Sequence, residues 1–265
     1  MQSIAYILSG QQRFINRSIE SQMIAMGTTK EGTAKKGTKV DIYATFWQQP
    51  GPCTSGKEVR EYLQDTLSSI PIKGIQNSVN IKECNTVNVF RQLPRVASMP
   101  VMNMAEMYYS MLESYKNFCL NTFRNGKGNS YGLLVRSRSD IAFKIQFSEE
   151  LIKSIIKSSC IKKAVAFQDI PEEIKADYPF KDECVSDVFF MGVPRYASEA
   201  FQVFLKLPYI DEYFEELEHP GRLFTGILKK HGIDILKLPP LSITQRASFG
   251  REMAKGRHLG NSISI

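Results

Sequence analysis

Short apolar runs recur along the chain, and most of them lack the alternation of apolar and polar residues that marks a half-exposed strand. Continuous runs of this kind are typical of strands covered on both faces, as in a parallel sheet. The pattern therefore predicts strands at 4–8, 40–46, 79–81, 132–135, 164–167, 188–191 and 233–238.

Helical periodicity is clearest over 103–123, where methionines, tyrosines and other apolar residues recur at three- and four-residue steps. Asn103 is expected to cap this helix, and its apolar stripe is expected to pack in the core rather than bind a cofactor. Ser148 is expected to cap another helix, with two glutamates in its first turn. Further helices are predicted at 13–26, 58–67, 195–205, 212–218 and 220–231.

Strands and helices alternate over most of the length, which predicts an α/β fold with a mostly parallel central sheet flanked by helices. We expect a single domain over 1–245, followed by a basic, flexible tail over 246–265. The lysine-rich stretch 28–39 is expected to be a solvated loop, with a lid over a ligand as the alternative.

Charge and cysteine content narrow the choice of partners. The net charge is +7, which favours an anionic partner such as a nucleotide, a polyphosphate, nucleic acid or an acidic membrane surface. The chain has 5 cysteines and no CxxC spacing, so neither a disulfide framework nor a zinc site is expected. The first residues lack the basic region of a signal peptide, and no apolar run approaches the roughly 20 residues of a membrane span. A cytoplasmic protein without a transmembrane segment is therefore expected.

The first candidate site follows the first predicted strand and comprises Ser9, Gly10, Gln11 and Arg13. A glycine at a strand end allows a ligand to approach the backbone closely, and an arginine can grip a phosphate with two parallel hydrogen bonds. The alternative is an ordinary strand-to-helix turn with a solvated arginine. The residues do not form the GxGxxG pattern of a dinucleotide site, and the chain has no P-loop.

The second candidate site is the run Arg136-Ser137-Arg138-Ser139-Asp140, placed after the predicted strand 132–135. In an extended segment, residues two apart share a face, so Arg136, Arg138 and Asp140 are expected to point together. Asp140 could hold Mn²⁺ or Mg²⁺ bridging a diphosphate, and Arg138 could meet the same diphosphate directly. The alternative is a local arginine–aspartate ion pair at the edge of the sheet.

Two further residues are candidates for ligand contact. Asp187 precedes a predicted strand and could act as a general base or bind an acceptor hydroxyl, with an ordinary turn residue as the alternative. Trp47, the only tryptophan, could stack on a base or a sugar, with simple packing as the alternative.

The order of these motifs resembles that of GT-A-like bacterial and viral glycosyltransferases. In that family a first strand ends in SGQ-x-R, a second strand similar to VDIF is followed by an aromatic residue, a central strand ends in R-x-R-x-D, and a later SD leads a strand that ends in glycine. The corresponding residues here are Ser9-Gly10-Gln11-Gln12-Arg13, Val40-Asp41-Ile42-Tyr43 with Phe46-Trp47, Arg136-Ser137-Arg138-Ser139-Asp140, and Ser186-Asp187 with Gly192.

The resemblance implies a GT-A-type fold and transfer of a sugar from a nucleotide-sugar donor to a glycan or another hydroxyl acceptor. It places the residues after the first strand at the nucleotide, Asp140 where GT-A enzymes carry a metal-binding DxD motif, and Asp187 near the acceptor. Arg138 occupies the place of the first aspartate of DxD, so metal dependence is an open point. An arginine there could partly replace the cation by neutralising the diphosphate leaving group electrostatically.

Three other functions remain open from the sequence. A basic nucleic-acid-binding protein fits the net charge, although aromatic and basic residues are not interleaved as in a stacking platform. A nucleotidyltransferase fits the predicted fold but would require a glycine-rich loop after the first strand. A degenerate transferase would bind a nucleotide or glycan without turnover.

Overall fold

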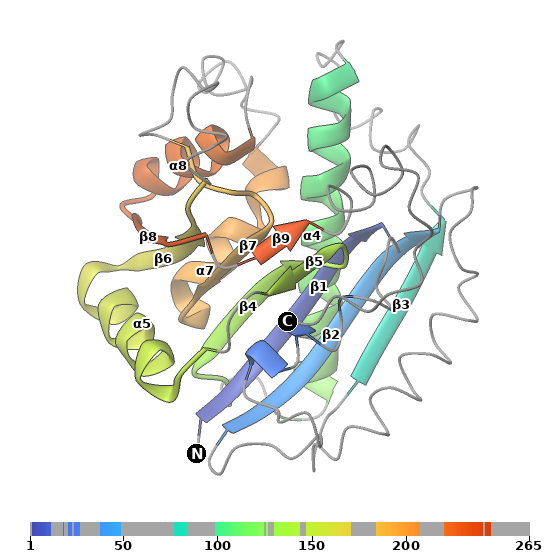
Figure 1. The fold of residues 1–265 in the computed structure, drawn as a ribbon. Helices are drawn as coiled ribbons and strands as arrows, with labels where there is room; N and C mark the ends of the chain where they lie inside the picture. The colour runs from blue at the N-terminus through green and yellow to red at the C-terminus, as the bar shows by residue number, and fades with distance from the viewer. Residues whose placement is uncertain are drawn as a thin grey trace, which may run out of the picture.

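The chain forms an α/β fold in which helices flank a mixed, mostly parallel sheet (Figure 1). The computed structural model describes residues 2–11, 18, 21–22, 24–26, 38–48, 77–83, 99–124, 126, 130–143, 147–170, 184–206, 220–240 and 242–244. The predicted helices 58–67 and 212–218, the tail 246–265 and nearly all of the lysine-rich stretch 28–39 lie outside these ranges.

Within the described ranges, seven strands form the main sheet, in the order β3-β2-β1-β4-β7-β6-β8. Strand β7 runs antiparallel to its neighbours β4 and β6, and the other neighbouring pairs are parallel. The strands are β1 (Gln2–Gln11), β2 (Thr38–Gln48), β3 (Asn77–Glu83), β4 (Leu133–Arg138), β6 (Ala164–Gln168), β7 (Phe189–Gly192) and β8 (Asp234–Leu238).

The predicted strands all occur, with one informative difference at β4. This strand continues to Arg138, so Arg136 and Arg138 lie inside the sheet rather than beyond it. A charged residue would ordinarily end a buried strand, but here the side chain of Arg136 is partly paired by hydrogen bonds to Ser9 and Asp187. The sequence pattern also gave no signal for a second, two-stranded sheet formed by β5 (Ile141–Phe143) and β9 (Ser242–Thr244).

Four helices have described bounds: α4 (Met99–Arg124), α5 (Glu149–Lys162), α7 (Pro194–Phe201) and α8 (Pro220–Lys230). The prediction that Asn103 caps α4 is wrong, because the helix already begins at Met99. Pro100 is tolerated there, since the first turn of a helix does not use its own N–H groups. The cap at Ser148 is confirmed, because its Oγ accepts a hydrogen bond of 3.0 Å from the backbone N–H of Leu151.

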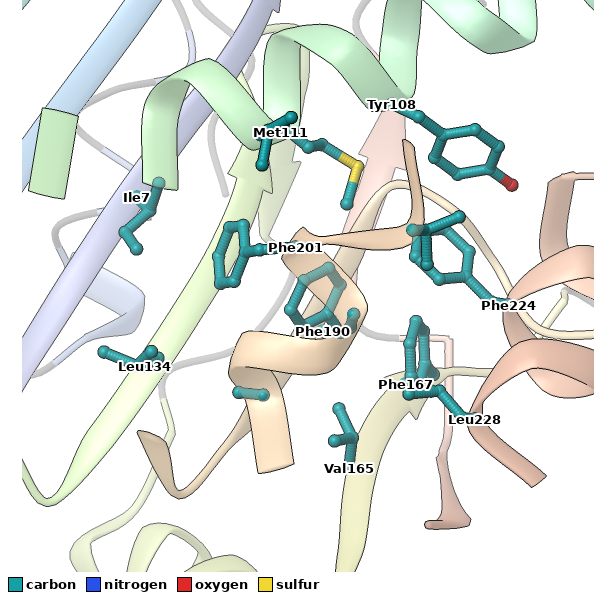
Figure 2. Packing of buried hydrophobic residues seen from close by; sticks show 14 of the residues in the cluster. Ile7, Tyr108, Met111, Leu134, Val165, Phe167, Phe190, Phe201, Phe224 and Leu228 are labelled. Atoms are coloured by element: carbon teal, nitrogen blue, oxygen red, sulfur yellow. The ribbon is translucent and has the colours of Figure 1, made fainter. Parts of the chain in front are cut away.

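The sheet has an apolar core on each face. On one face, α4 lies across β1 and β2, and its stripe packs in the core as predicted (Figure 1). Figure 2 shows Met111 of α4, Phe190 of β7 and Phe201 of α7 as neighbours in this cluster. The other face is covered by α5 and by a short segment between β1 and β2, whose described residues have mostly helical backbone. No helix within the described ranges is long and apolar enough to cross a membrane.

Candidate functional site

The register of the two central strands brings polar residues together at their carboxyl ends. Strands β1 and β4 are parallel, and their pairing sets Ile7 opposite Arg136 and Ser9 opposite Arg138. The hydroxyl of Ser9 accepts a hydrogen bond of 3.2 Å from Nε of Arg136. Ligands bind at the carboxyl ends of strands in open α/β sheets, so this position is a candidate site.

Arg136 is a fully buried cation with incomplete pairing. Its Nε bonds to Ser9, and its Nη1 donates to the main-chain oxygen of Asp187. Its Nη2 is also buried and has no hydrogen-bond partner among the described residues. Burial lowers the pKa of Arg136 to about 10, while the negative charge of Asp187 opposes that shift. The side chain therefore remains charged at neutral pH, in a position where an unpaired charge is costly.

Arg138 lies at the end of β4 and is partly accessible, with 28% of its side chain exposed. Its Nε and Nη2 donate to the two carboxylate oxygens of Asp140, at 2.8 Å and 2.6 Å. Its Nη1 is 3.8 Å from Oδ2 of Asp187. Burial lowers the pKa of Arg138, but the charges of Asp140 and Asp187 raise it by more, so the pKa lies above its ordinary value.

Asp187 reaches this site because of the direction of β7. Since β7 runs antiparallel to β4, the residues that precede β7 lie beside the carboxyl end of β4. The backbone N–H of Arg138 donates to the carbonyl of Val188 at 3.2 Å, which extends the contact beyond the paired strands. The side chain of Asp187 is 23% exposed and its Oδ2 is 3.8 Å from Nη1 of Arg138, so these two partly exposed side chains lie next to each other.

Of the other predicted site residues, the structure describes Gly10 fully, Gln11 and Trp47 by their backbone, and Arg13 not at all. Gly10 has a φ of +115°, a backbone conformation that favours glycine, and no described atom lies within 4 Å of where a Cβ would stand. The glycine thus serves the local backbone conformation. Gln11 and Trp47 are opposite each other in β1 and β2, but their side chains lie outside the described part of the structure. Arg13 lies wholly outside the described residues.

Two residues near the site were not predicted from the sequence. Tyr108 of α4 interacts electrostatically with both Asp187 and Arg136; burial raises the pKa of this phenol, and the charge of Asp187 raises it further. Thr45 of β2 is fully buried and opposite Ser9, and its hydroxyl has no hydrogen-bond partner within the described ranges. Neither residue stands out in the sequence, because each belongs to an apolar run or stripe.

The arrangement around Asp140 does not fit the predicted metal ligand. Both of its carboxylate oxygens accept hydrogen bonds from Arg138, so a divalent cation held there would stand beside a guanidinium charge. A grouping of three or more His, Cys, Asp or Glu side chains suited to a metal ion does not occur in the described part of the chain. Asp140 therefore acts as the partner of an arginine, and not as a metal ligand, in this structure.

Comparison of the sequence with protein-family models and with curated proteins identified no relative. The resemblance to GT-A-like transferases therefore depends on the order of the motifs in the sequence.

Proposed function

We propose that this protein is a glycosyltransferase that moves a sugar from a nucleotide-sugar donor to a hydroxyl group of a glycan or another acceptor. The observation that carries the proposal is the placement of Arg136 and Arg138 at the carboxyl ends of β1 and β4, with Asp187 beside them. The order of motifs along the chain, which resembles that of GT-A-like transferases, also supports the proposal.

Arg138 is the residue we assign to the diphosphate of the donor. A guanidinium has five N–H groups, and the two-point pair with Asp140 uses only two of them. The remaining N–H groups, those of Nη1 beside Asp187 among them, can donate to phosphate oxygens without breaking the pair with Asp140. During transfer the bond between the anomeric carbon and the diphosphate breaks, and its electron pair stays on the diphosphate. A cation already held beside the leaving diphosphate oxygen stabilises the negative charge that develops there.

Asp187 is the residue we assign to the acceptor. In an inverting transfer, the acceptor oxygen forms a new bond to the anomeric carbon while its proton passes to the carboxylate of Asp187. In a retaining transfer, Asp187 only positions the acceptor. Its carboxylate is 3.8 Å from Nη1 of Arg138, so acceptor and leaving group would lie within one small region.

We further propose that arginine charge at this site neutralises the leaving group in the place of a cation bound by Asp140. Arg136 lies two residues before Arg138 in the same strand, so the two side chains are on the same face of the sheet. Arg136 stays protonated at neutral pH because its pKa is about 10. Two cations are thus fixed near the position assigned to the diphosphate.

A thermal-shift panel tests the donor site. The ligands are UDP, GDP, CMP and TDP with their sugars, each measured with Mn²⁺ and with EDTA. A ligand that binds only the native state raises the melting temperature, and we expect a shift with one nucleotide class that persists in EDTA. Arg138→Ala should abolish the shift, whereas Arg195→Ala, which removes an exposed arginine of α7, should retain it. Flat curves, or an equal shift in the Arg138→Ala variant, would refute the donor site.

A further inference from the structure

A buried polar cluster lies behind the proposed site, on the opposite face of the sheet. Ser18, Ser21 and Gln22 have helical backbone, and their spacing of three and four residues puts them on one face of a helix. All of these side chains are buried. They contact residues 138–143, the segment that carries Arg138 and Asp140.

Gln22 holds both ends of the turn that follows β4. Its Nε2 donates to the main-chain oxygen of Arg138 at 3.0 Å and to that of Ile141 at 2.8 Å. Its Oε1 accepts a hydrogen bond of 2.9 Å from the hydroxyl of Tyr6. Because a carbonyl oxygen can only accept, the amide nitrogen must face the turn, and both of its N–H groups are used.

The two serines hold the same turn at other points. The hydroxyl of Ser18 donates to the main-chain oxygen of Ser139 at 2.5 Å, and that of Ser21 accepts from the backbone N–H of Phe143 at 3.3 Å. These bonds all go to backbone atoms of the turn and of strand β5 that follows it. They leave the side chains of Arg138 and Asp140 free to pair with each other on the other side.

We propose that Gln22 is a positioning residue for the ligand site: it fixes the turn so that Arg138 and Asp140 form their two-point pair and Arg138 meets a diphosphate. The identity of that ligand rests on the proposed function, whereas the fixing of the turn does not. Without the amide, the buried main-chain oxygen of Ile141 loses this donor, and that of Arg138 keeps only the hydrogen bond of 3.2 Å from the hydroxyl of Ser137, so the turn relaxes. A hydrogen bond to a charged group contributes about 1.5–3 kcal/mol, so a displaced Arg138 should lose about 10- to 100-fold in affinity for a phosphate ligand.

The test compares Gln22→Met with Asn117→Leu, using inorganic pyrophosphate as the probe in titration calorimetry. Asn117 is a matched control, because its buried amide also donates to a strand carbonyl, that of Ala44 in β2, at 3.3 Å. Both variants lose a buried amide and some stability. We expect pyrophosphate affinity to fall about 10- to 100-fold in Gln22→Met and to stay near wild type in Asn117→Leu. An equal loss in both variants would overturn the positioning role.

A pH profile of Gln22→Glu separates positioning from simple stability. An ionised carboxylate would face the carbonyl oxygens of Arg138 and Ile141 with no donor, whereas a protonated one donates one hydrogen bond. The affinity of this variant relative to wild type should therefore be higher at about pH 5.5 than at about pH 8. A ratio that does not change with pH would contradict the proposal. If Gln22→Met does not fold, Ser18→Ala gives the same comparison, with a smaller loss of affinity expected.

Hydrogen exchange tests the turn without any ligand. In the Gln22 variant, the amides of residues 141–143 should exchange faster than in wild type, while those of α5 stay unchanged. If wild type does not bind pyrophosphate but this local change occurs, the proposed function fails and the positioning of the turn stands. If exchange in the turn is unchanged, the positioning role is wrong whatever the ligand.

Discussion

Arg138 and Asp140 are joined by two parallel hydrogen bonds, of 2.8 Å and 2.6 Å, across a turn of the chain. The pair fixes the plane of the guanidinium, because a fork-to-fork contact allows only one orientation. Under the function proposed above, we expect Asp140 to contribute by fixing the orientation of Arg138.

Replacing Arg138 by lysine should disrupt this geometry while keeping the charge. Lysine has no planar fork, so it cannot hold Asp140 and a diphosphate together. We expect sugar transfer to fall about 100-fold or more, as when one donor to a developing negative charge is removed. Initial rates measured with the donor found in the thermal-shift panel check this, with Arg195→Lys as the control. A loss of less than threefold would contradict the role of the fork.

Arg136→Met should separate stability from binding. The substitution removes a fully buried charge whose Nη2 has no hydrogen-bond partner among the described residues, and it keeps most of the side-chain volume. Replacing a buried charge by a well-packed apolar group is often neutral or stabilising. We therefore expect urea unfolding to show equal or higher stability, with weaker nucleotide binding. A large loss of stability would mean that the charge contributes to folding.

The same pair of proteins should show a pH dependence. The pKa of Arg136 is lowered to about 10 in the folded state, so between that pH and its ordinary value the unfolded chain binds more protons. Wild-type stability should consequently rise relative to Arg136→Met as the pH increases from about 9 to about 11. Urea unfolding of both proteins across this range measures the difference. A difference independent of pH would contradict the lowered pKa.

Asp187→Asn should distinguish the chemical step from donor binding. Its main-chain oxygen still accepts from Arg136, so the local fold is retained, but the side chain can no longer accept a proton. For an inverting transfer, we expect kcat to fall about 100- to 10,000-fold, with an unchanged thermal shift for the donor nucleotide. Loss of the thermal shift would instead place Asp187 in donor binding.

The apolar core predicts one stability contrast between two phenylalanines. Phe190 is fully buried, and its ring centroid lies 4.9 Å from that of Phe201 (Figure 2). Phe190→Ala should cost about 3–5 kcal/mol. Phe123 on α4 is 85% exposed, so Phe123→Ala should change stability by less than about 0.5 kcal/mol. Urea unfolding of both variants checks this, and similar losses would contradict the assigned core.

The strands and the long helix could be predicted because local apolar patterns determine them. The end of β4 could not, since the burial of Arg136 depends on Ser9 and Asp187, which are far away in the sequence. The closeness of Asp187 to Arg138 likewise depends on the antiparallel direction of β7. Gln22 gave no signal, because a glutamine in a helix carries no information about the carbonyl groups it will meet.

The pairing between β5 and β9 could not be predicted from the sequence pattern either. Ile141 lies opposite Thr244, and each strand has only three residues, too few to show a period. The motifs themselves were visible as residue types in order. Their mutual distances were not, because a one-dimensional pattern does not determine strand order.

A crystal structure of the protein with the nucleoside diphosphate that gives the thermal shift tests the central claim most directly. We expect the diphosphate at the carboxyl ends of β1 and β4, with phosphate oxygens within hydrogen-bond distance of Arg138 and the pair with Asp140 intact. A nucleotide bound elsewhere on the fold, or a diphosphate held through a cation on Asp140 with Arg138 turned away, would contradict it.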